Sequence, residues 1–289
     1  MSFATLEEVC RLTEEKNEAF WQVILREDAM EEALTEKESF AKMTEMYRAM
    51  KRADETYDGS LRSESGLAGG DGLLLENFRK QENRLIGDFL TEVMEKAVKM
   101  GESNACMRRI VAAPTAGSCG VIPAVLLTYE KQKGVAEERM VEALYVAGGI
   151  GEVLANSASI SGAAGGCQAE IGSASAMAAG AITYLEGGTN EEICHAVALS
   201  LKNLLGLVCD PVAGLVEVPC IKRNVMGAVN AVVSSQMVKA GIRSKIPVDE
   251  VIDSMRRIGN QLPGCLRETS QEGLATTPTA IRIQKEVRA

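Results

Sequence analysis

The absence of strand-forming patterns is the feature of this sequence that most constrains its fold. No run of alternating β-branched residues occurs anywhere in the chain. Apolar residues instead recur at spacings of three and four, as in Leu6, Val9 and Leu12. This period predicts an all-α fold. Ala, Gly and Ser are abundant in the second half, so we expect a tightly packed helical bundle with active-site loops at the helix ends.

Glycines and capping residues predict where individual helices begin and end. Gly101 is expected to end a helical block that starts at residue 73. Thr189 followed by Glu192 forms a capping box and predicts a helix from residue 190 onward. Glycines and serines make residues 57–73 a predicted loop. Further helices are predicted over 121–133, 136–154, 168–186, 221–241 and 248–259.

The charge and the length of the chain exclude several classes of protein. The 289 residues carry 40 acidic and 31 basic side chains, a net charge of -9 that disfavours nucleic-acid and anionic-membrane surfaces. The uncharged stretch 171–185 is too short to cross a bilayer as a helix. Because the N-terminal residues are acidic and amphipathic, unlike a secretory signal, we expect a cytoplasmic protein.

The domain organisation is predicted from the change in amino-acid composition along the chain. Residues 1–56 are charged and helical in period, and are expected to form an N-terminal helical segment. Residues 57–289 hold the glycine-rich loops and are expected to form the catalytic domain. The two parts are predicted to make one continuous domain, because 46% apolar content is enough to bury a large core.

Eight cysteines are many for a reducing compartment, where disulfides rarely persist. Three of them, Cys167, Cys209 and Cys220, sit in or beside breaks marked by glycine or proline. No close C-x2-C pair is present, which disfavours a structural zinc site. Thiolates from distant loops can also hold an iron-sulfur cluster, so the spacing favours iron over zinc.

Five motifs, in this order, resemble the iron-sulfur-dependent bacterial L-serine dehydratases, specifically their α subunit or α domain. They are SESGLAGGD (63–71), APTAGSCGVIPAVL (113–126), SGAAGGCQAEIGSASAMAA (161–179), NLLGLVCDPVAGLVEVPCIKRN (203–224) and LPGCLRETSQEGLATTPTA (262–280). The resemblance implies that Cys167, Cys209 and Cys220 hold a four-iron four-sulfur (4Fe-4S) cluster. It also implies that one iron has no cysteine ligand and acts as a Lewis acid.

The expected reaction removes water from L-serine and ends in pyruvate and ammonia. A base must take the α-proton, and an electrophile must help the β-hydroxyl leave. Loops rich in Gly, Ser and Thr can offer N–H groups and hydroxyls to the substrate carboxylate. The expected catalytic residues are Ser65, Asp71 and Arg223, with Asp71 facing the ammonium group. The expected substrate-binding residues are Ser63, Gly66, Gly69, Gly70, Thr115, Gly117, Ser118 and Arg267.

The general base is missing from this set. The only histidine, His195, falls inside a predicted helix. In the family that this sequence resembles, the histidine-bearing motifs belong to the β subunit, which implies a hetero-oligomer with a separate β chain. The C-terminal residues contain no cysteine. The fourth iron is therefore open, or Cys119 or Cys265 approaches it; we favour the open iron.

Three other functions remain as alternatives. An L-cysteine desulfidase would keep the fold and the cluster and release sulfide. A pyridoxal-phosphate dehydratase would use Lys202 or Lys222 as its Schiff base and would need alternating strands and helices. A cluster-bearing subunit without enzymatic activity is the third.

Overall fold

The computed structural model describes residues 3–287, and its named elements are all helices. These residues contain no β-strand, only an isolated parallel bridge between Cys209 and Arg267, so the predicted all-α fold is confirmed. The elements are α1 (Leu6–Lys16), α2 (Phe20–Glu31), α3 (Glu36–Glu55), α4 (Asp71–Arg79), α5 (Asp88–Ala105), α6 (Val121–Lys133), α7 (Glu137–Ser157), α8 (Gly162–Gly165), π-helix η1 (Gln168–Gly172), α9 (Ser173–Leu185), α10 (Asn190–Lys202), η2 (Val212–Gly214), α11 (Cys220–Lys239), α12 (Val248–Gln261), η3 (Gly264–Leu266), η4 (Gly273–Thr276) and α13 (Pro278–Val287).

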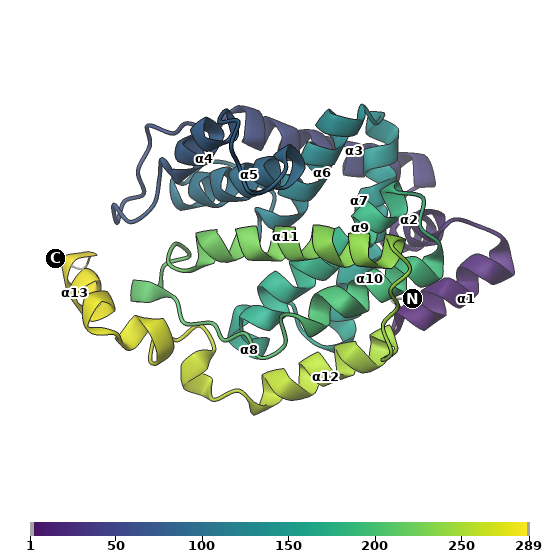
Figure 1. The fold of residues 1–289 in the computed structure, drawn as a ribbon. Coiled ribbons are helices and arrows are strands. Elements are labelled where there is room, and N and C mark those ends of the chain that lie inside the picture. Colours follow the sequence, from purple (N-terminus) through teal and green to yellow (C-terminus); the bar gives the residue numbers. More distant parts are fainter. Residues whose placement is uncertain (1–2, 288–289) are drawn as a thin grey trace.

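Helix α9 is the centre of the bundle. Its residues from Ser173 to Tyr184 are all buried, and it packs against α6, α7, α10 and α11 (Figure 1). Eight of these twelve residues are Ala, Ser or Gly. Short side chains let neighbouring helix axes approach closely, so this sequence is suited to a helix surrounded on all sides.

Most of the predicted helices are confirmed. The helices predicted over 121–133, 136–154, 221–241 and 248–259 correspond to α6, α7, α11 and α12, with ends within three residues. The capping box at Thr189 is formed: its hydroxyl accepts from the N–H of Glu192, and α10 begins at Asn190. The helix predicted over 168–186 is divided, because its first turn is the π-helix η1 and only the remainder is α9.

The prediction for residues 73–101 is wrong. The block contains two helices, α4 and α5, separated at residues 80–87, and α5 continues through Gly101 to Ala105. A Cβ added to Gly101 would lie 3.2 Å from the side chain of Ile221 in α11. Gly101 therefore allows α5 and α11 to pack closely and does not end the helix.

The ends of several helices meet at one end of the molecule. In Figure 1 the first residues of α11, the short helix α8 and the last residues of α12 all lie toward α13, whereas α1 lies at the opposite end. The connections that precede α11 and follow α12 therefore come together. None of the helices formed by residues 3–287 is long and apolar enough to span a membrane.

Gly120, which precedes α6, provides a test of this packing. A Cβ added there would lie 2.5 Å from the backbone oxygen of Ala97 in α5. Because backbone cannot rotate away, Gly120→Ala is expected to destabilise the fold by about 2 kcal/mol and lower the melting temperature by about 4 °C. Gly148→Ala in α7 is the matched control, since no atom outside its own stretch of helix lies within 4 Å of its added Cβ. Equal melting temperatures for the two variants would contradict the prediction.

Candidate active site

The three cysteines singled out in the sequence are brought together at the end of the bundle where α11 begins. Cys167 is the residue before η1, Cys209 forms the isolated bridge to Arg267, and Cys220 is the first residue of α11. They are only 1%, 2% and 5% exposed, and none is in a disulfide. The fold therefore gathers three buried free thiols from two separate segments, one at Cys167 and the other over residues 209–220.

The backbone fixes the positions of two of these cysteines. The N–H of Cys209 donates to the carbonyl of Leu266, and its carbonyl accepts from the N–H of Glu268. Gly166, with φ of 77°, turns the chain into Cys167, and a Cβ there would lie 2.6 Å from Leu262. This position thus requires glycine for both its conformation and its space.

The electrostatic environment distinguishes the thiols from one another. The hydrogen bond from the Cys209 thiol, together with the nearby Arg223 guanidinium, lowers the pKa of Cys167. The same pairing and burial raise the pKa of Cys209. Burial raises the pKa of Cys220 to about 12, and the neighbouring Cys167 also contributes. Metal binding by these sulfurs would release protons, because thiolates are the ligating form.

Arg223 joins this site to a buried aspartate. Its guanidinium donates to Asp210 Oδ1 at 2.9 Å and to the carbonyl of Val208 at 2.9 Å. The other oxygen of Asp210 accepts from the N–H of Leu274 at 2.8 Å. One ion pair thus connects α11, the segment around Cys209 and the residues before α13.

The predicted first substrate loop, residues 63–71, is attached to the site through Glu217. Ser63 and Ser65 both donate to Glu217 Oε2, at 2.8 Å and 2.7 Å. The two hydroxyls also accept from the N–H groups of Ala68 and Leu67. The glycines of this loop, Gly66, Gly69 and Gly70, all have positive φ, which gives the loop its tight turns.

The predicted second loop, residues 113–120, is attached through Asn224. This side chain is 1% exposed and donates to the carbonyls of Gly117 and Cys220, at 2.7 Å and 3.0 Å. Its Oδ1 accepts from the N–H of Gly120 at 2.8 Å. The second loop is thereby held against the first turn of α11.

Glu170, on η1, faces this second loop. Its carboxylate accepts hydrogen bonds from the hydroxyl of Thr115 and from the N–H of Gly117. Thr115 in turn lies 2.9 Å from the hydroxyl of Ser118. Burial raises the pKa of Glu170, and the neighbouring Glu268 carboxylate raises it further.

Two predicted site residues are occupied by other contacts. Asp71 is half exposed and forms an ion pair with Lys222 at 2.6 Å, which links α4 to α11. Arg267 donates to the carbonyls of Leu262 and Asn260 at the end of α12. In this structure, therefore, Asp71 already has a cationic partner and Arg267 caps a helix.

The other cysteines and the histidine have separate surroundings. Cys119 is fully buried against Met100, and burial raises its pKa to about 12. Cys265 lies in η3 and is half-buried. His195 lies on α10 and contacts Glu191 of the same helix at 3.3 Å.

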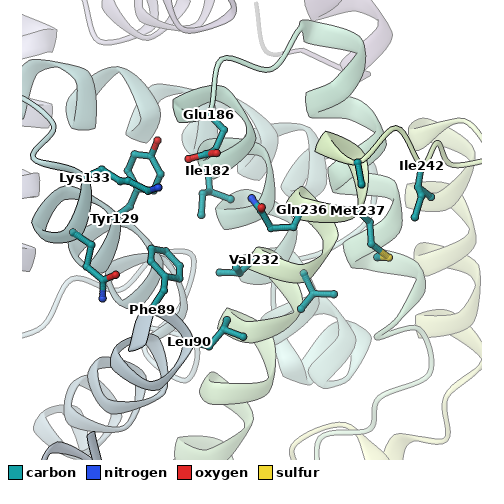
Figure 2. A pocket seen from close by; sticks show the side chains of 13 residues that line it. Phe89, Leu90, Tyr129, Lys133, Ile182, Glu186, Val232, Gln236, Met237 and Ile242 are labelled. Carbon is teal, nitrogen blue, oxygen red and sulfur yellow. The ribbon is translucent and has the colours of Figure 1, made fainter. Parts of the chain in front are cut away.

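A pocket elsewhere on the molecule is unsuited to this chemistry. It has a volume of about 650 Å³ and lies between α5, α6, α9 and α11 (Figure 2). Its walls are mainly apolar side chains such as Phe89, Leu90 and Val232, and no cysteine or histidine lines it. Val232 follows Cys220 by twelve residues, or about 18 Å along α11.

Among residues 3–287, no three or more His, Cys, Asp and Glu side chains form a ready-made set of ligands for a metal ion. The three thiols are neighbours, with Cys167 and Cys209 paired to each other.

Sequence reasoning named these cysteines but missed Glu170, Asp210, Glu217 and Asn224. All four lie inside the motifs 161–179 and 203–224. The signal that could have found them is a polar residue surrounded by apolar and small residues, which indicates a buried polar group.

Comparison with known proteins places the whole chain in one family. The family model for the serine dehydratase alpha chain matches residues 15–275. The chain is 46% identical over 285 residues to a probable L-serine dehydratase alpha chain of Bacillus subtilis (strain 168), covering 99% of this chain and 95% of that protein. It is 37% identical over 283 residues to the L-serine dehydratase alpha chain of Peptoniphilus asaccharolyticus, covering 98% and 97%. L-serine dehydratase TdcG of Escherichia coli (strain K12) is 44% identical over 181 residues, which are 62% of this chain and 40% of that protein. The chain belongs to the serine dehydratase alpha chain family.

Proposed function

We propose that this protein is the alpha chain of an iron-sulfur L-serine dehydratase, which converts L-serine to pyruvate and ammonia. The observation that carries the proposal is the match along nearly the whole chain to proteins named as L-serine dehydratase alpha chains. The buried thiols support the same function, because they are neighbours on the segments where the family resemblance is concentrated. The pyridoxal-phosphate alternative is disfavoured, because its alternating strands are absent from residues 3–287.

We propose Cys167, Cys209 and Cys220 as the ligands of a 4Fe-4S cluster. Thiolate sulfur is the usual protein ligand of such clusters, and the three thiols are free and buried. Arg223 beside them places a positive charge near an anionic group. When bound, the cluster supplies a Lewis acid at an iron without a cysteine ligand. Cys119 packs in the core against Met100, which supports leaving it out of the ligand set.

The first and second loops are proposed to hold the substrate. Ser63 and Ser65 donate their hydroxyl protons to Glu217, and Thr115 donates to Glu170, so these side chains fix the two loops in place. The backbone N–H groups of loops fixed in this way can bind a carboxylate at a small entropic cost. Burial of the surroundings strengthens these hydrogen bonds by excluding water.

The catalytic base is proposed to come from a beta chain. The only histidine of this sequence, His195, contacts Glu191 and none of the site residues described above. The relatives are named alpha chains, which supports the presence of a second, beta chain in the enzyme. The longer protein from Escherichia coli, of which this chain matches 40%, supports an activity that needs further sequence.

Anaerobic purification tests the proposed function. The alpha chain is expected to carry about four iron and four sulfide per chain, and to release pyruvate from L-serine only when a beta chain is co-expressed. Exposure to air should remove both iron and activity. Sulfide release from L-cysteine without pyruvate release from L-serine would favour the desulfidase instead. A complex that holds the cluster yet converts neither amino acid would favour a non-enzymatic subunit.

A further inference from the structure

We propose that the Glu170 carboxylate binds the ammonium group of the amino-acid substrate. The inference rests on the function proposed above. It replaces the expectation that Asp71 faces the ammonium, because Asp71 is half exposed and already paired with Lys222.

The position of Glu170 is set by its contacts with the second loop. The side chain is buried, and a Cβ added to Gly117 would lie 2.6 Å and 2.8 Å from its two carboxylate oxygens. Only glycine therefore leaves room for this carboxylate. The Thr115 hydroxyl and the Gly117 N–H hold it in place, so its orientation is fixed before any substrate binds.

The carboxylate lies beside the thiols that are proposed to hold the cluster. A Cβ added to Gly162 would lie 3.5 Å from Glu170 Oε2 and 3.1 Å from the sulfur of Cys209. Glu170 and Cys209 therefore both lie against Gly162, and Glu268 Oε2 lies 3.3 Å from the same added Cβ. L-Serine is a small molecule. If its ammonium group binds at Glu170, its hydroxyl and carboxylate therefore lie close to the thiols and to the second loop.

Glu170 lacks a positively charged partner among residues 3–287. Asp210 is paired with Arg223 and Asp71 with Lys222, but no lysine or arginine forms an ion pair with Glu170. A buried carboxylate is costly unless a cation pairs with it, and the adjacent Glu268 increases that cost. An incoming ammonium group supplies the missing cation and favours the ionised form of the carboxylate.

Two compounds that do not react separate ammonium binding from the other roles of this site. L-Alanine keeps the ammonium and carboxylate of serine and lacks the leaving hydroxyl. 3-Hydroxypropanoate keeps the carboxylate and hydroxyl and lacks the ammonium. In the cluster-loaded alpha-beta complex, Glu170→Gln is expected to weaken L-alanine binding by at least about 30-fold, as measured by calorimetry. Its affinity for 3-hydroxypropanoate should stay within about twofold of wild type.

The kinetic constants and a second variant complete the test. Glu170→Gln should raise KM for L-serine by a similar factor, whereas a general base would lower kcat and leave L-alanine affinity unchanged. Thr115→Val, which keeps the charge and removes one hydrogen bond, should weaken L-alanine binding by a smaller factor. If Glu170→Gln loses iron or folded structure, Thr115→Val decides: it should weaken L-alanine binding and leave 3-hydroxypropanoate binding within about twofold of wild type. Unchanged L-alanine affinity, or equal losses for the two compounds, overturns the proposal.

Wild-type measurements keep this inference separate from the proposed function. If the wild-type complex forms no pyruvate from L-serine, the proposed function fails, and this inference fails with it. If wild type forms pyruvate and Glu170→Gln binds L-alanine normally, only the role of Glu170 is overturned. Equal losses of affinity for L-alanine and 3-hydroxypropanoate also overturn it, because they would indicate general damage to the site.

Discussion

Cys209→Ser is expected to leave the alpha chain with little bound iron and to reduce pyruvate formation by more than about 100-fold. Mutation of residues that only hydrogen-bond to a metal ligand already lowers metal affinity or activity by about 10–100-fold, and loss of a ligand should cost more. Cys209 is buried, and its thiol is hydrogen-bonded to Cys167. A serine hydroxyl at this position is a poor ligand for iron compared with a thiolate. Iron and sulfide analysis of anaerobically purified protein, with its visible absorbance, measures the first effect. A pyruvate assay of the complex measures the second.

Cys265→Ser is the matched control for this variant. Cys265 is a half-buried thiol in η3, one residue before the segment that pairs with Cys209. The same chemical change there should leave iron content and turnover close to wild type if the fourth iron is open. Full iron content and activity in Cys209→Ser would refute the proposed ligand set. Loss of iron in Cys265→Ser would instead make Cys265 the fourth ligand.

The helices were predictable from sequence to the extent that local signals decide them. The capping box at Thr189 and the apolar period of α12 are local, and both were placed within two residues. The prediction that Gly101 ends a helix is wrong because this glycine serves a tertiary contact. It makes room for Ile221 of α11. The π-helix η1 was missed for a similar reason, since no local pattern distinguishes its five residues from the α-helix that follows.

The site was predictable in part. Cysteines at glycine-marked breaks are visible in sequence, and the structure brings Cys167, Cys209 and Cys220 together. Glu170 was not predictable, because a lone glutamate between alanine and isoleucine gives no sign that it faces a loop more than fifty residues earlier. Asn224 is another such case, since its role depends on Gly117 and Gly120 lying beside α11.

The ion pair between Arg223 and Asp210 stabilises the arrangement of segments around the thiols. Both side chains are largely buried, at 14% and 5% exposure, and their nitrogen and oxygen are 2.9 Å apart. Asp210 also accepts the N–H of Leu274, and a Cβ added to Gly273 would lie 2.6 Å from it. Its charge is therefore enclosed by protein, and Arg223 is its only ion-pair partner among residues 3–287.

Arg223→Met is expected to destabilise the protein by at least about 3 kcal/mol, because it removes one member of a buried pair and leaves the other charged and unpaired. The melting temperature should fall by about 6 °C or more. In the double variant Arg223→Met, Asp210→Asn the aspartate charge is removed as well, and much of the lost stability should return because neutral replacements of buried pairs are often tolerated. Thermal and urea unfolding of the two variants and wild type make the comparison. If Arg223→Met has the same melting temperature as wild type, or if the double variant is less stable than Arg223→Met, the buried pair does not hold these segments together.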